Sequence, residues 1–160
     1  MVSIVQSFLL FSSFLLLMNC ASFQPKKFSQ QALDEKLVTL DKDSISFQTI
    51  LDKNSGKDKF VQIFASYCPV SQDSFDDVLK FQQENPEKEY IFLSVDHNYY
   101  DWKRGLKYVK PKGQFYYIPK KDKGALGTFL KIKSIPRFIK IDAQGNIKVY
   151  KTSKVSEKLK

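Results

Sequence analysis

Short apolar runs alternate along the chain with stretches in which apolar residues recur at helical spacing. The runs are rich in β-branched and aromatic residues, which favours strands. We expect strands at residues 36–40, 59–66, 89–95, 114–118, 137–142 and 147–151. Helices are expected within residues 46–56, after residue 68, and within 100–109 and 123–132. Strands and helices that alternate before a final hairpin predict an α/β fold, with helices on the faces of a mixed sheet.

Two turn signals support these boundaries. Asn85-Pro86 ends the long helix after residue 68. Gly145 lies between the last two strands and supplies the positive φ of a tight hairpin. We expect residues 36–160 to form one domain, because a chain of this length can bury a hydrophobic core and its many aromatic side chains can fill it.

The first 19 residues contain no charged side chain, and their apolar stretch runs from Phe8 to Met18. This length is typical of a signal peptide and short for a membrane core of about 30 Å. Leu17 stands three residues before Cys20, which resembles a bacterial lipoprotein signal. We therefore expect a lipoprotein-type signal peptide at residues 1–19 and lipid on Cys20. The alternatives are a cleaved secretion signal, an uncleaved anchor, or a cytosolic protein.

Residues 20–35 are polar and show no sustained period, so we interpret them as a flexible tether with a span of about 20 Å. A lipid on Cys20 would anchor the protein to a membrane of the bacterial cell envelope, where it would face the periplasm or the exterior. Cys68 would then be the only free thiol of the mature chain. Such a domain has no internal disulfide and must be stabilised by its core.

Cys68 lies where a predicted strand gives way to a predicted helix, in the sequence Cys68-Pro69-Val70-Ser71. Pro69 suits the first helical position, since its missing N–H would have no partner there. We expect the Cys68 sulfur to accept a hydrogen bond from the amide of Val70 or Ser71. The helix dipole favours the thiolate by about 0.3–1 kcal/mol. Three aspartates in the same helix oppose it: Asp73, Asp76 and Asp77. The alternative is an inert cysteine that fills a small core position.

Two segments carry a family resemblance, namely residues 64–71 (FASYCPVS) and 134–147 (SIPRFIKIDAQGNI). Together they resemble the thioredoxin-fold superfamily, in particular the exported thiol-disulfide oxidoreductases of the TlpA/ResA type. The resemblance covers about residues 59–151 and implies a thioredoxin-like fold. It implies that Cys68 is the attacking cysteine, that Ser71 replaces the resolving cysteine, and that Pro136 is a cis proline facing Cys68. It also implies substrate-binding positions at Tyr67, Pro69 and Ile135.

The chain departs from the family pattern at three places. Ser71 removes the second cysteine, and Gln62 stands where thioredoxins proper bury a carboxylate. The C-terminal segment 153–160 is short for the last helix of the family, so we expect one face of the sheet to be thinly covered.

A single thiol limits the chemistry that the site can perform. Attack of a thiolate on a disulfide gives a mixed disulfide, and Ser71 offers no second sulfur to resolve it. We therefore expect Cys68 to exchange with thiols or disulfides of client proteins, or with a small thiol, without any cofactor. The alternative is a non-catalytic lipoprotein that binds a partner with the same groove.

The net charge of +9 is concentrated in residues 103–133, which hold ten Lys and Arg against one Asp. This segment is either a solvated face or a binding face for an anionic partner, such as lipid headgroups, an acidic envelope polymer or an acidic client. No nucleic-acid-binding motif is present, so nucleic acid is not expected. His97 is the only histidine, and the sequence gives no convincing set of metal ligands around it.

Overall fold

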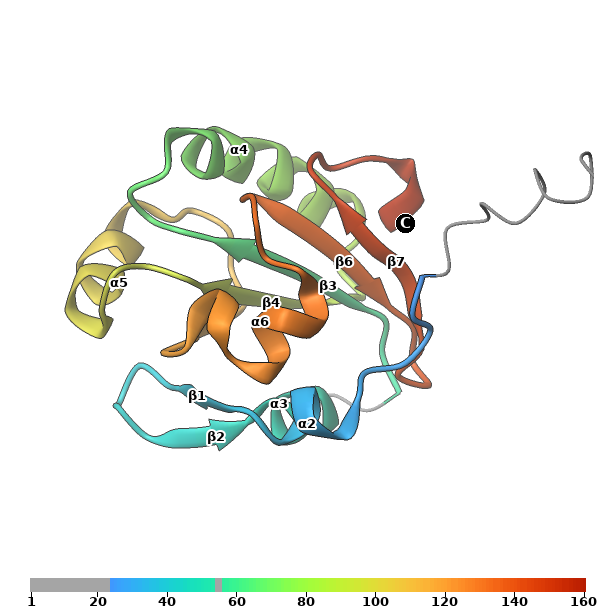
Figure 1. The fold of residues 1–160 in the computed structure, drawn as a ribbon. Helices are drawn as coiled ribbons and strands as arrows, with labels where there is room; N and C mark the ends of the chain where they lie inside the picture. The colour runs from blue at the N-terminus through green and yellow to red at the C-terminus, as the bar shows by residue number, and fades with distance from the viewer. Residues whose placement is uncertain (1–23, 54–55) are drawn as a thin grey trace, which may run out of the picture.

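Seven strands form one mixed sheet in the order β2-β1-β5-β4-β3-β6-β7 in the computed structural model, which describes residues 24–53 and 56–160 (Figure 1). The central strands β3, β4 and β5 are parallel, and the others pair antiparallel to their neighbours. The strands are β1 (Lys36–Val38), β2 (Ser44–Ser46), β3 (Lys59–Phe64), β4 (Glu89–Ser94), β5 (Gln114–Tyr117), β6 (Arg137–Ile141) and β7 (Ile147–Thr152).

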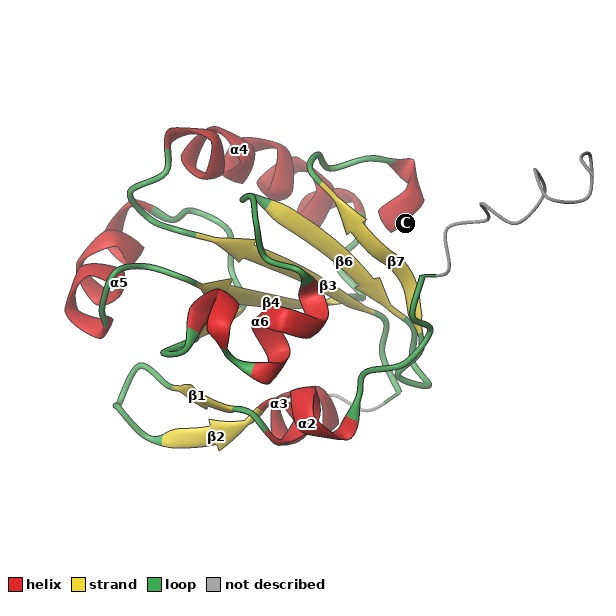
Figure 2. Ribbon diagram, viewed as in Figure 1, coloured by secondary structure: helices red, strands yellow, loops and turns green. Residues whose placement is uncertain are grey.

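Helices cover both faces of the sheet (Figure 2). One face carries α2 (Gln30–Asp34), α3 (Phe47–Asp52) and α6 (Ala125–Leu130). The other carries α4 (Pro69–Glu84), α5 (Tyr99–Gly105) and the short 3₁₀ helix η4 (Glu157–Leu159). Two further 3₁₀ helices are η2 (Leu106–Tyr108) and η3 (Lys121–Lys123).

The core lies in two layers because successive side chains of a strand point to opposite faces. In β3, Val61 and Ile63 belong to the layer under α3 and α6, whereas Phe60 and Phe64 belong to the layer under α4. All six residues of β3 are buried, including the polar residues Lys59 and Gln62. Leu159 of η4 is also fully buried, so the short C-terminal segment does contribute to the second layer.

This architecture confirms the predicted α/β fold with a mixed sheet flanked by helices. The hairpin between β6 and β7 is antiparallel, and Gly145 has a φ of 81°. Among the strands and α-helices, β2 and α2 were not predicted, because three and five residues are too few to establish a period.

The segment predicted as a flexible tether differs from the structure over its described part, residues 24–35. It contains α2, in which Ala32 is fully buried. The Phe28 ring lies 5.0 Å from that of Phe47 and 5.1 Å from that of Phe129. The Lys26 carbonyl accepts a 2.7 Å hydrogen bond from the Ile147 amide. These residues therefore belong to the domain, and scattered apolar side chains hold them there without a regular pattern.

The predicted signal peptide at residues 1–19 and the lipidation site at Cys20 lie outside the described residues. Within residues 24–53 and 56–160, none of the helices combines the length and the apolar character needed to cross a membrane.

Candidate active site

Cys68 occupies the N-cap position of α4, beyond the end of β3. Its amide donates to the Ala65 carbonyl at 3.1 Å, and its carbonyl accepts from the Gln72 amide at 3.0 Å. Pro69 occupies the first helical position, as predicted. The expected sulfur cap is absent, because the Cys68 side chain makes no capping hydrogen bond. The free thiol is instead half-buried and packs against the core layer under α6.

Ser71 lies one turn further along α4 and is fully buried. Its Oγ has no hydrogen-bond partner among the described residues. Its carbonyl accepts from Ser74 Oγ at 2.7 Å, and that hydroxyl accepts from Gln62 Nε2 at 3.0 Å. Gln62 Oε1 is likewise buried without a partner in the described structure. The space beneath the start of α4 is therefore polar and neutral, with no carboxylate at position 62 to accept a proton.

Ile135 and Pro136 approach the same edge of the sheet from β6. Arg137, the first residue of β6, pairs with Ile63 near the end of β3. The residues before β6 and those after β3 therefore lie at the same edge, and the Ile135-Pro136 peptide bond is cis, as the resemblance implied. Ile135 packs against the same core layer as Cys68.

Asp96 is a buried acid at this edge that the sequence analysis did not assign to the site. Its carboxylate accepts hydrogen bonds from the Ser66 amide at 3.1 Å, from Ser66 Oγ at 2.7 Å and from Ser94 Oγ at 2.5 Å. It thereby fixes the turn between β3 and Cys68. The sequence does contain a signal for it, because a polar residue directly after a buried parallel strand lies at the edge where such sheets place their sites.

Two pockets lie at this edge of the sheet, one beside Tyr67 and one beside Ile135. Tyr67 is 53% exposed and stacks on His97, with ring centroids 4.4 Å apart and the planes 6° from parallel. This pair lines a pocket of about 290 Å³, together with Arg104, Lys107 and Tyr108. A second pocket of about 210 Å³ lies beside Ile135. Its remaining lining residues are Val95, Lys121, Asp122, Ile132, Lys133 and Ser134.

The basic segment 103–133 does not form one continuous face. Its first part, α5 and η2, lies over the same side of the sheet as α4, whereas η3 and α6 lie over the opposite side. The basic residues consequently reach both pockets. Arg104 and Lys107 line the one beside Tyr67, and Lys121 and Lys133 line the one beside Ile135.

Solved structures of similar fold include bacterial redox proteins. The thioredoxin domain of a thiol-disulfide oxidoreductase from Bacteroides vulgatus matches with a TM-score of 0.63 and 20% identity, covering 83% of this chain and 94% of that one. A secreted disulfide oxidoreductase from Mycobacterium tuberculosis matches with a TM-score of 0.59 and 12% identity, over 81% and 92% of the two chains. An exposed lipoprotein thioredoxin from Streptococcus pneumoniae gives 0.58 and 20%, over 78% and 92%. At these identities the likeness shows a common fold.

No curated protein matches the sequence significantly. The family model described as thioredoxin-like matches residues 56–147, which is more than half of the chain and includes both segments on which the resemblance rested. The chain therefore belongs to the thioredoxin-like family.

Proposed function

We propose that this protein carries out thiol–disulfide exchange in the bacterial cell envelope through Cys68 alone. The thiolate attacks a disulfide of a client protein or of a small thiol, a new S–S bond forms, and the client's other sulfur leaves as a thiolate. That released thiol, or another one, must later attack the mixed disulfide, because position 71 offers no sulfur.

One observation carries this proposal: the two positions of the motif differ sharply in access. Cys68 is half-buried and caps a 16-residue helix, whereas Ser71 is fully buried beneath it. A reacting thiol needs access to a partner, and only position 68 has it. Similar structures include thiol-disulfide oxidoreductases and an exposed lipoprotein thioredoxin, which supports both the chemistry and the envelope location.

Restoring the second cysteine tests the geometry. Residue 71 lies one helical turn from Cys68, so we expect Ser71→Cys to form a reversible disulfide under mild oxidation and to reduce insulin. Ser74→Cys is the matched control. Six residues along a helix correspond to about 9 Å, which no disulfide spans. Failure of Ser71→Cys to form the bond would contradict a thioredoxin-like arrangement at this site.

Trapping of clients tests the reaction itself. Wild-type cells should contain reductant-sensitive adducts of the protein that disappear in Cys68→Ser, because a mixed disulfide without an internal resolving thiol is long-lived. If the Ser71→Cys disulfide forms but no Cys68-dependent adduct is found, the second candidate is favoured, a binding module that uses the same groove without chemistry. The observation that favours this binding module is the half-burial of Cys68 against the core.

A further inference from the structure

We propose that the pocket beside Ile135 selects client segments that carry carboxylates on one side of the reacting cysteine. This inference rests on the proposed exchange at Cys68 and assigns its substrate class, an extended polypeptide with acidic residues next to the cysteine. We infer this class of client segment from three features of the pocket: its apolar floor, its uncompensated positive charge, and its position on one side of Cys68 only.

The pocket combines an apolar floor with basic side chains. Val95 and Ile132 are buried, and with Ile135 they form the floor. Lys121 and Lys133 also line the pocket, against the single carboxylate of Asp122. Such a floor suits an apolar side chain of a client, and the ammonium groups suit carboxylates beside it.

The positive charge at this pocket is not neutralised by the protein. Residues 120–133 contain five lysines against Asp122, a net charge of +4. In the described part of the chain, none of these lysines forms an ion pair. Lys121 Nζ donates only to the His97 carbonyl, at 3.1 Å. This charge is therefore available to a ligand.

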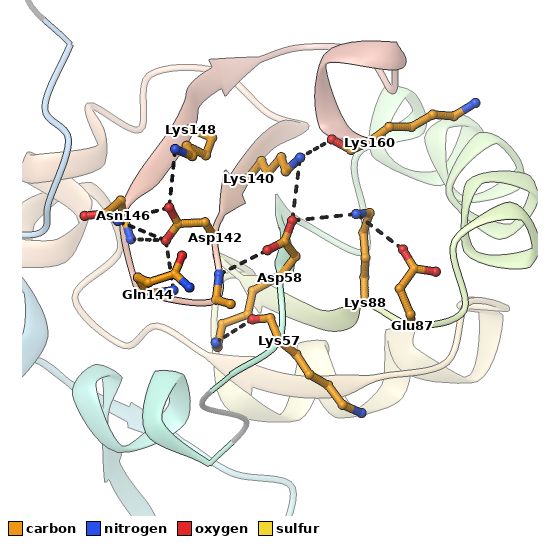
Figure 3. A network of polar contacts seen from close by, with 12 residues as sticks. Lys57, Asp58, Glu87, Lys88, Lys140, Asp142, Gln144, Asn146, Lys148 and Lys160 are labelled. Carbon is orange, nitrogen blue, oxygen red and sulfur yellow. Dashed lines mark hydrogen bonds and ion pairs between the residues drawn. The ribbon is translucent and has the colours of Figure 1, made fainter.

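Lysines at the opposite end of the sheet do form ion pairs (Figure 3). Lys88 and Lys140 both approach Asp58, at 3.9 and 3.6 Å. Lys148 pairs with Asp142 at 3.4 Å. These three lysines at the far end are therefore paired with carboxylates, unlike the five lysines of residues 120–133.

The pocket on the other side of Cys68 lacks such an excess. Arg104 is paired there with Asp101, and the buried carboxylate of Asp96 lies in the lining. Only Lys107 remains, and its ammonium lies over the Tyr108 ring at 4.8 Å. Carboxylates of a client should therefore be attracted on the Ile135 side and not on the Tyr67 side.

The reaction of synthetic peptides with Cys68 tests this asymmetry. Each peptide carries one cysteine as a 2-pyridyl disulfide. The Cys68 thiolate attacks the peptide sulfur, the peptide–Cys68 disulfide forms, and pyridine-2-thiolate leaves. The released thiolate takes up a proton from water and is followed as 2-thiopyridone by its absorbance. Three peptides of equal length are compared, with two glutamates before the cysteine, with two glutamates after it, and with glutamine at all four positions.

We expect one of the two acidic peptides to react about tenfold faster than the glutamine peptide, and the other to stay within about twofold of it, as for contacts of a few exposed charges. In Lys121→Gln/Lys133→Gln the ratio of the acidic to the glutamine rate should fall toward one. The matched control is Lys57→Gln/Lys148→Gln, which removes the same charge at the far end of the sheet and should keep the ratio.

Equal rates for all three peptides would overturn the inference. Equal acceleration of both acidic peptides, or an equal loss in the control variant, would also overturn it, because the attraction would then come from the overall charge and not from this pocket. Failure of Cys68 to react with any peptide would instead refute the proposed exchange reaction, so the two failures are distinguishable.

Discussion

Position 71 places a hydroxyl in a fully buried site where it has no partner in the described structure. A buried hydroxyl that lacks a hydrogen bond costs about 1–3 kcal/mol relative to one in water. We therefore predict that Ser71→Ala keeps or raises the free energy of unfolding, by up to about 1 kcal/mol, in urea titrations. A serine whose removal does not destabilise the fold would be retained for another reason, such as a hydrogen bond to the Cys68 sulfur during reaction.

The neighbouring Ser74→Ala provides the contrast, since Ser74 Oγ bonds both to the Ser71 carbonyl and to Gln62 Nε2. Its loss should cost about 1 kcal/mol or more. A Ser71→Ala variant that is destabilised as strongly as Ser74→Ala would show that the Ser71 hydroxyl has a stabilising partner.

For single residues, the sequence predicted the structure correctly where one residue determines the local backbone geometry. Pro69 predicted the helix start, and the segment around Pro136 implied a cis bond that the structure contains. The prediction that the Cys68 sulfur caps α4 was wrong. The direction of a side chain depends on its packing, and Cys68 turns toward the core. Asp96 was not assigned because its partners, Ser66 and Ser94, converge only after two strands pair.

Helix α5 approaches the turn before Cys68 so closely that only glycine fits at position 105. A Cβ there would lie 2.0 Å from Ser66 Oγ. Helix propensity favours alanine over glycine by about 1 kcal/mol, but overpacking of this kind costs about 1–3 kcal/mol or more. We predict that Gly105→Ala lowers the free energy of unfolding by up to about 2 kcal/mol, the net of these two effects, and changes the rate at which Cys68 is alkylated.

A double-mutant cycle tests the cause of that loss. If the clash with Ser66 is responsible, Gly105→Ala should cost less in a Ser66→Gly background than in the wild type. If the two substitutions change the free energy of unfolding additively, the contact with Ser66 does not cause the loss of stability.

The β6–β7 hairpin contains a carboxylate that makes stability depend on acidity. The hydrogen bond from the Asn146 side chain, with further bonds from backbone amides, holds the pKa of Asp142 below its ordinary value of 3.8. On acidification the unfolded chain therefore takes up this proton first. The resulting stability is present above about pH 4 and is lost as the pH falls through the lower pKa of the folded state.

We predict that Asp142→Asn is less stable than the wild type at neutral pH and that the difference shrinks below pH 4, measured as urea midpoints across pH 2–7. Parallel pH profiles of the two proteins would contradict a lowered pKa for this carboxyl.

Among elements, the long and strongly patterned ones were predictable from the sequence and the short ones were not. β3, β4 and α4 were predicted closely, because six to sixteen residues of one pattern establish a period. β2 forms because Leu37 pairs with Ile45 across a hairpin, and no property of three residues alone indicates this.

For the molecule as a whole, the described N-terminal segment is part of the fold. Phe28 contacts the rings of Phe47 and Phe129. We predict that Phe28→Ala lowers the free energy of unfolding by about 2 kcal/mol, from lost apolar burial and aromatic contact. Lys27→Ala, at an exposed neighbouring position, should change it by less than about 0.5 kcal/mol. If both substitutions change the free energy of unfolding equally and only slightly, this segment is a tether after all.

The docking of this segment determines which way the protein faces when it is held from its N-terminal side. Lys26 binds the start of β7, whereas Cys68 lies beyond the far end of β3, a strand of about 20 Å. If lipid on Cys20 anchors the chain, as the sequence predicts, Cys68 points away from the bilayer. Partners embedded in the same membrane would then be out of reach, and those arriving from the aqueous side would meet the thiol first.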